Sequence, residues 1–126
     1  MSKAKRIRPP EHDLAEYVVG LSFNDLNSEA NEHISKMVLD TVAISIGAYN
    51  KNHKSGLIAE QHALAQYRSN DGCKLWSGQG LVPADMAALC NGTWAEVLDY
   101  QDVVVDPRNN GHVGVTVIPA ALAIAQ

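Results

Sequence analysis

A short span in the last third of the chain carries most of the side chains that could do chemistry. Three carboxylates, at Asp99, Asp102 and Asp106, are followed after an Arg-Asn-Asn-Gly segment by the imidazole of His112. An imidazole titrates near neutral pH, and a carboxylate beside it makes a frequent pair for general acid–base catalysis. A solvated acidic loop has the same composition, so spacing alone leaves both interpretations open.

Two other chemistries fit this span less well. The order D-x-x-D-x-x-x-D lacks the glycine turn and the terminal glutamate of a calcium loop, so we expect no metal site. A nucleophilic triad needs a serine or cysteine on a sharp turn, and none is placed in this way. His112 also precedes an apolar segment, where an imidazole and a helix N-terminus could both face an anionic substrate.

The elements that must hold this span are expected to be helices. Apolar residues recur at helical spacing over residues 11–21, 28–48, 57–67, 83–98 and 115–126. The second of these is apolar on nearly every face, which predicts a buried central helix. Residues Cys73 to Trp76 predict one short extended segment. The fold class is therefore all-α and bundle-like.

Three positions within these helices carry particular expectations. Asp40 lies in the apolar helix and would need a polar partner there, as a structural hydrogen bond or as a catalytic acid. Ser55 is the expected N-cap of the third helix. Gly92 interrupts the fourth helix at a cost of about 1 kcal/mol relative to alanine. Such a glycine indicates close approach of another backbone or of a ligand.

Composition limits the class of protein. The 126 residues are 46% hydrophobic and 19% charged, which predicts a folded chain of one domain or less. The net charge of −4 argues against a nucleic-acid partner, and four of the ten cations lie in an expected flexible tail over residues 1–10. The sequence shows neither a secretory signal nor an apolar run long enough to span a membrane. Cys73 and Cys90 do not have the spacing of a disulfide framework, so a reduced cytoplasmic protein is expected.

Several motifs together resemble one family. PADMAALCNGTWAEVLDYQD at residues 83–102 and GHVGVTVIPAALAIAQ at residues 111–126 are similar to the MmgE/PrpD superfamily, whose best-known members are 2-methylcitrate dehydratases. The stretches at 14–17, 25–26 and 38–41 resemble the family's opening helices. The resemblance covers about residues 13–126. It implies that residues 11–126 are the N-terminal part of an all-helical domain, without the rest of that domain and the α+β lid.

The resemblance also implies a function and site residues. Family members are usually homodimers that need no organic cofactor or metal and act by proton chemistry on small di- or tricarboxylates. Carried over by position, Asp99 matches the first acid of the family motif L-D-[FY]-D-D, and His112 matches the loop histidine, so both are expected to be catalytic. The implied substrate-binding residues are Asn91, Thr93, Gln101 and Asp102.

Departures from the family pattern leave the reaction open. Gln101 stands where the family usually has a second acid, Val103 replaces a common threonine, and Val113 replaces the usual proline. Besides a dehydratase, an epimerase or isomerase acting on an iminodisuccinate-like substrate and a decarboxylase of an aconitate-like substrate stay open. A helical interaction fragment without catalysis is a further alternative.

The charge of the C-terminal part indicates that the site is incomplete. Residues 75–126 contain five acidic residues and one cation, Arg108. A polycarboxylate would be repelled unless positive side chains come from elsewhere. The chain alone is therefore expected to be inactive, and its apolar residues 115–126 are expected to support self-association, as a dimer.

Overall fold

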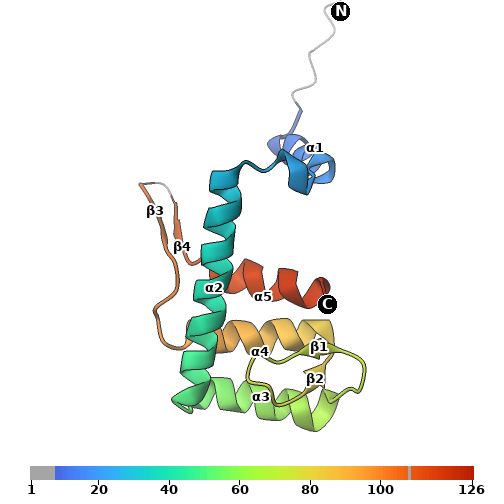
Figure 1. Cartoon of the computed structure of the whole chain (residues 1–126), viewed down its shortest axis with the longest axis vertical. Helices are drawn as coiled ribbons and strands as arrows, with labels where there is room; N and C mark the ends of the chain where they lie inside the picture. Colours follow the sequence, from blue (N-terminus) through green and yellow to red (C-terminus); the bar gives the residue numbers. More distant parts are fainter. Residues whose placement is uncertain (1–7, 108) are drawn as a thin grey trace, which may run out of the picture. The chain divides into compact units, whose positions relative to one another are not determined.

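The computed structural model describes residues 8–107 and 109–126 and is mostly helical, as expected (Figure 1). In these residues the α-helices are α1 (Pro10–Gly20), α2 (Ser28–Asn50), α3 (Lys54–Tyr67), α4 (Ala84–Glu96) and α5 (Gly114–Ile124), with a 3-10 turn η1 (Phe23–Asp25). The strands are β1 (Cys73–Lys74), β2 (Leu81–Val82), β3 (Val104–Asp106) and β4 (Asn109–Gly111). The described residues form two compact units, one that ends at His33 and one that begins at Ile34.

The first unit begins with α1. Pro10 is the first residue of this helix, where a missing N–H costs nothing, so the helix starts inside the range expected to be a tail. The basic residues Lys3, Lys5 and Arg6 of that tail lie outside the described residues. Arg8 pairs with Glu16 and Asp13, and all three side chains are largely exposed, so these pairs stabilise little.

The helix α2 begins at a side-chain cap. Asn27 Oδ1 accepts the backbone N–H of Ala30 at 2.8 Å, the bond that an N-cap asparagine makes. The prediction that this helix is buried on all sides was wrong. Only its small residues Thr41, Ser45 and Ala48 are buried, while Leu39 is 70% exposed. Because neighbouring elements cover one side alone, Asp40 is exposed and needs no partner.

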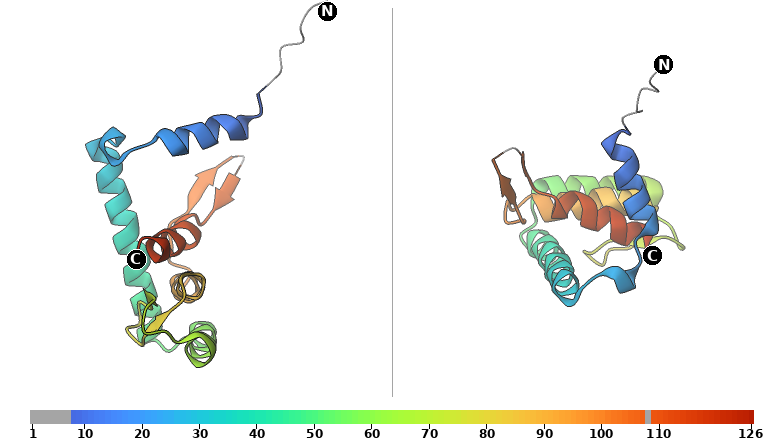
Figure 2. Two further views of the ribbon diagram at one scale, coloured as in Figure 1. Left: turned by 90° about the vertical axis from the view of Figure 1, so that its right-hand side faces the viewer. Right: turned by 90° about the horizontal axis from the view of Figure 1, so that it is seen from above.

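The second unit is built around α4. Figures 1 and 2 show α3, α4 and α5 side by side, with α4 in the middle. The buried side chains of this layer include Leu75, Val82, Ala87, Cys90 and Trp94. The core therefore lies on α4 and its two helical neighbours rather than on α2.

Trp94 is the largest fully buried side chain and has three close partners. Its ring packs on Gly56 of α3, where an added Cβ would lie 2.2 Å from the ring atom Cε3. Its Nε1–H donates to Glu60 Oε2 at 2.9 Å, and the Tyr49 ring meets it edge-on at 5.5 Å. The expected N-cap at Ser55 was wrong, because α3 begins at Lys54 with His53 before it and no side-chain cap bond.

Two short strand pairs connect the helices. The expected extended segment is present in part: β1 pairs antiparallel with β2, with Cys73 opposite Val82. The pair β3–β4 was not predicted from the sequence. In it Val104 lies opposite Gly111. This hairpin returns the chain from the end of α4 to the start of α5 (Figure 1).

Candidate active site

The turn after α4 sets the direction of the acidic span. The backbone N–H of Asp99 bonds to the carbonyl of Glu96 at 3.0 Å, and Asp99 has φ of 54°. This left-handed conformation is uncommon outside glycine, and aspartate tolerates it better than most residues. The Asp99 side chain is exposed. It is not among the residues that line the groove described below.

Asp102 joins the two ends of the hairpin. Its backbone carbonyl accepts a hydrogen bond from His112 Nδ1 at 2.9 Å. Its carboxylate Oδ2 accepts the backbone N–H of Gly114 at 3.3 Å, at the positive end of the α5 dipole. A Cβ at Gly114 would lie 2.1 Å from Asp102 Oδ1, so glycine leaves the room that this carboxylate occupies. Asp102 thus positions His112 and the first residue of α5.

The bond to Asp102 fixes the tautomer of His112. A carbonyl oxygen can only accept, so Nδ1 carries the proton and the neutral ring has its lone pair on Nε2. The ring is exposed and lines a groove, so Nε2 can reach a bound molecule. The arrangement is an imidazole that is oriented by the backbone and can accept a proton at Nε2.

This tautomer is a direct prediction for the chain in solution. We expect long-range ¹H–¹⁵N spectra above pH 8 to show His112 protonated at Nδ1, whereas an unconstrained histidine such as the exposed His33 should show mainly the Nε2 form. The same spectrum supplies this internal control. A His112 ring protonated mainly at Nε2 would contradict the bond to Asp102.

The groove lies between α4 and the start of α5, has a volume of about 770 Å³ and opens to solvent. Its polar lining comes from Ser55, Thr93, Glu96, His112 and Thr116. The remaining lining residues are Ala88, Leu89, Gly92, Val97 and Val115. Among the described residues that line it there is no lysine or arginine. A polar molecule of modest size could enter beside the imidazole.

The helices α4 and α5 approach closely at Gly92. A Cβ there would lie 3.2 Å from the carbonyl oxygen of Val115. Pro119, one turn further along α5, has no N–H to bond that carbonyl. Of the two expectations for Gly92, close backbone approach is confirmed. Gly92 also lines the groove, so ligand proximity stays open.

Comparison with protein-family models matches residues 12–126 to the MmgE/PrpD N-terminal domain. The chain belongs to the MmgE/PrpD family. Comparisons with curated proteins and with solved structures gave no match. The family resemblance noted in the sequence is therefore confirmed over almost the same residues.

Thr93, one of the implied substrate-binding residues of this MmgE/PrpD domain, lines the groove. Its Oγ1 donates to the carbonyl of Leu89 at 2.7 Å, which leaves the lone pairs of the hydroxyl for another donor. One turn further along α4, Glu96 lines the same groove. Sequence reasoning missed Glu96, although its i+3 spacing from Thr93 places both on one side of a helix.

Gln101, where the MmgE/PrpD pattern usually has an acid, is buried with 8% exposure. Its Nε2 donates to Glu96 Oε2 at 2.8 Å. Its Oε1 is buried and has no hydrogen-bond partner within residues 8–107 and 109–126. Gln101 does not line the groove itself but contacts a residue that does.

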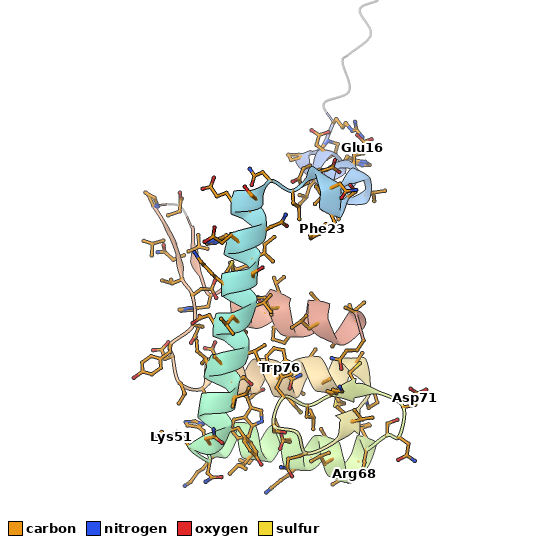
Figure 3. All side chains as sticks on the ribbon, in the orientation of Figure 1. Glu16, Phe23, Lys51, Arg68, Asp71 and Trp76 are labelled. Carbon is orange, nitrogen blue, oxygen red and sulfur yellow. The ribbon has the colours of Figure 1, made fainter. Side chains whose placement is uncertain are left out.

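Asn91 is fully occupied by the backbone of the β1–β2 connection in this MmgE/PrpD domain. Its Oδ1 accepts the N–H of Trp76 at 2.9 Å, and its Nδ2 donates to the carbonyl of Lys74 at 3.1 Å. Trp76, labelled in Figure 3, lies in this connection beside α4. Asn91 is buried and is absent from the groove lining, so the structure does not bring it to His112.

Replacing this amide should destabilise the domain. We expect Asn91→Ala to lower the free energy of unfolding by about 2 kcal/mol, because it leaves two backbone groups of Lys74 and Trp76 without their partner. Urea unfolding followed by circular dichroism measures this change. Asn70→Ala, at an exposed bend, is the matched control and should change stability by less than about 0.5 kcal/mol. Equal stability of Asn91→Ala and wild type would contradict the structural role.

Three further features of the described residues bear on other kinds of function. Within residues 8–107 and 109–126 no group of three or more His, Cys, Asp or Glu side chains is placed to hold a metal ion. Burial, and then the charge of Glu60, raises the pKa of the Cys90 thiol to about 11, so Cys90 is a poor nucleophile at neutral pH. In the same residues no helix combines the length and the apolar character needed to cross a bilayer.

Proposed function

We propose that this MmgE/PrpD domain supplies acid–base residues of a lyase of the 2-methylcitrate dehydratase type. The observation that carries the proposal is the orientation of His112, whose ring lines the groove and whose Nδ1–H is bonded to the Asp102 carbonyl, so that the lone pair lies on Nε2. The proton to be removed lies on the carbon next to a substrate carboxylate. Loss of hydroxide from the neighbouring carbon, as water, then gives the unsaturated product.

Nearby groups suit the binding of a polar substrate. The hydroxyls of Ser55, Thr93 and Thr116 share the groove with His112 and can bond to hydroxyl or carboxylate oxygens. From the family resemblance we propose Asp99 as a second catalytic residue. Its left-handed backbone is consistent with this role, because such conformations are concentrated at functional sites. Its side chain would need a rearrangement of the turn, or a bound substrate, to reach the groove.

Among its described lining residues, the groove lacks the positive side chains that a polycarboxylate substrate would need. Glu96 is the carboxylate in its described lining, and no cation accompanies it there. A di- or tricarboxylate would therefore bind weakly to this domain. We propose that the remaining helical residues and the α+β lid of the family, or a second copy in a cytoplasmic homodimer, provide the positive side chains. The chain alone would then be inactive.

Two further functions use the same groups. An epimerase or isomerase of an iminodisuccinate-like substrate begins when Nε2 removes a proton from carbon in the same way. A decarboxylase of an aconitate-like substrate ends when the imidazolium gives a proton to the carbon that has lost CO₂. A helical interaction fragment without catalysis is favoured by the exposed apolar side chains of α2, such as Leu39 and Ile46.

A substrate panel separates these functions. The chain is assayed alone and together with the following domain of the family, which means the remaining helical residues and the α+β lid of a family member, produced separately. The substrates are 2-methylcitrate, citrate, cis-aconitate and iminodisuccinate, and products are followed by NMR. We expect dehydration of a hydroxylated polycarboxylate by the combined domains and none by the chain alone. Decarboxylation or epimerisation would identify an alternative reaction. Turnover by the chain alone would overturn the proposed incompleteness, and no turnover with any substrate would favour the interaction fragment.

A further inference from the structure

Glu96 is a carboxylate that shares the groove with the imidazole of His112. It is the last residue of α4, and His112 lies two residues before α5, so the two groups enter the groove from different elements. A dehydration needs two proton carriers, a base at the carbon and an acid at the departing oxygen. Within the described lining, Glu96 is the carboxylic group that can be this acid.

The hydrogen bond to Glu96 comes from a side chain in an unusual state. The Gln101 amide is more than nine-tenths buried and donates through Nε2 to Glu96 Oε2, while Oε1 lacks a partner among the described residues. A buried acceptor without a partner costs about 1–3 kcal/mol. Packing alone would favour an apolar residue here. A function that needs the second amide atom would explain why Oε1 of Gln101 is kept at this buried position.

An amide can bond to a carboxyl group in either protonation state. In the orientation observed, Nε2 donates to Glu96 Oε2, the bond that an amide makes to an ionised carboxylate. After a half-turn of the amide, Oε1 would accept the O–H of the protonated form. A residue that loses and regains a proton in each catalytic cycle is thus held in place throughout.

We propose that Glu96 is the general acid of this site and that Gln101 is the residue that positions it in both protonation states. This inference rests on the proposed role of His112 as the base.

The reaction step balances with these two groups. His112 Nε2 takes the proton from the carbon, and the electron pair of the broken C–H bond is held as the enolate of the neighbouring carboxylate until it forms the carbon–carbon double bond. The C–O bond breaks, its electron pair stays on oxygen, and that oxygen takes the proton of Glu96 and leaves as water. Glu96 is then a carboxylate bonded to Gln101 Nε2, as in the structure, and His112 is an imidazolium. Return of the proton from His112 to Glu96, through solvent, restores the starting state.

The kinetic test separates the acid from the base. It uses the chain with the following family domain, a hydroxylated polycarboxylate, and the analogue with fluoride in place of the hydroxyl, because fluoride departs with less help from an acid. For Glu96→Gln we expect about 10²- to 10⁴-fold slower dehydration, near-normal exchange of the carbon-bound proton with D₂O, and recovery with the fluoride analogue. Gln101→Met should lower kcat about tenfold with KM unchanged and recover in the same way. Asp85→Asn, exposed at the start of α4, is the matched control.

The outcomes distinguish this inference from the proposed function. Full dehydration by Glu96→Gln, or loss of proton exchange together with dehydration, would overturn Glu96 as the acid. Absence of proton exchange in the wild type would instead overturn His112 as the base. A measurement on the chain alone needs no turnover: Glu96→Gln should shift the side-chain NH₂ resonances of Gln101 in ¹H–¹⁵N spectra. Unchanged resonances would show that the two side chains do not interact, and would also overturn the inference.

Discussion

Gly56→Ala is expected to lower the free energy of unfolding by more than about 3 kcal/mol, enough to unfold a marginal domain. The added Cβ would lie 2.2 to 2.4 Å from three atoms of the Trp94 ring. The ring cannot move away easily, because Glu60 holds its Nε1 and Tyr49 packs against it edge-on. Relief would require α3 and α4 to separate, which would open the core around Trp94. Urea unfolding at equilibrium, followed by tryptophan fluorescence, measures the loss.

The matched control for this variant is Gly47→Ala in α2. A Cβ there meets one atom, Leu98 Cδ1, at an ordinary 3.9 Å, and Gly47 lies inside a helix. Alanine should therefore stabilise this position by up to about 1 kcal/mol through helix propensity alone. Opposite signs for the two variants would support the packing of Trp94 on Gly56. A stable Gly56→Ala protein would show that α3 and α4 do not meet in this way.

His112→Gln is expected to reduce turnover by the combined domains about 10²- to 10⁴-fold, the usual contribution of a general base. A glutamine can still donate to the Asp102 carbonyl through its amide, so the hairpin and the start of α5 should keep their positions. What it removes is the lone pair of Nε2. The loss should therefore fall on kcat, with KM and the free energy of unfolding little changed. Steady-state kinetics and urea unfolding of the same preparation test both expectations.

His62→Gln is the control for a general effect of removing a histidine. His62 lies on α3, is exposed, and meets Tyr67 edge-on at 5.9 Å, away from the groove lining. Its replacement should leave kcat within about twofold of wild type. If His112→Gln behaved in the same way as His62→Gln, the groove would not be the site of proton transfer.

The helices could be predicted because their signals are local. Asn27 capped α2 as its residue type indicates, and the apolar spacing placed α1 and α4 within about two residues of their bounds. The close approach at Gly92 also followed from sequence, because a glycine inside a helix needs a reason. The family motif marked Asp99 and His112, and the structure gives His112 an orientation that suits a base.

What the sequence did not reveal depends on which distant residues meet. The burial of α2 could not be read from its apolar faces, because periodicity does not specify how many neighbours a helix has. The β3–β4 pair was not predicted, because the span was interpreted from its charged residues, although Val103, Val104 and Val105 favour a strand. Asn91 looked like a site residue, but its amide bonds backbone groups fifteen and seventeen residues earlier. Glu96 could not be identified as a candidate site residue from the sequence, because its hydrogen bond to Gln101 is known only from the structure.

The measurement that tests the central claim most directly is exchange of a carbon-bound proton into D₂O. The chain, combined with the following domain of its family, is incubated with a hydroxylated di- or tricarboxylate, and loss of the signal of the proton next to the carboxylate is followed by ¹H NMR. If His112 Nε2 is the base, the wild type exchanges this proton and His112→Gln slows the exchange at least about a hundredfold. Equal exchange by both proteins would contradict the claim.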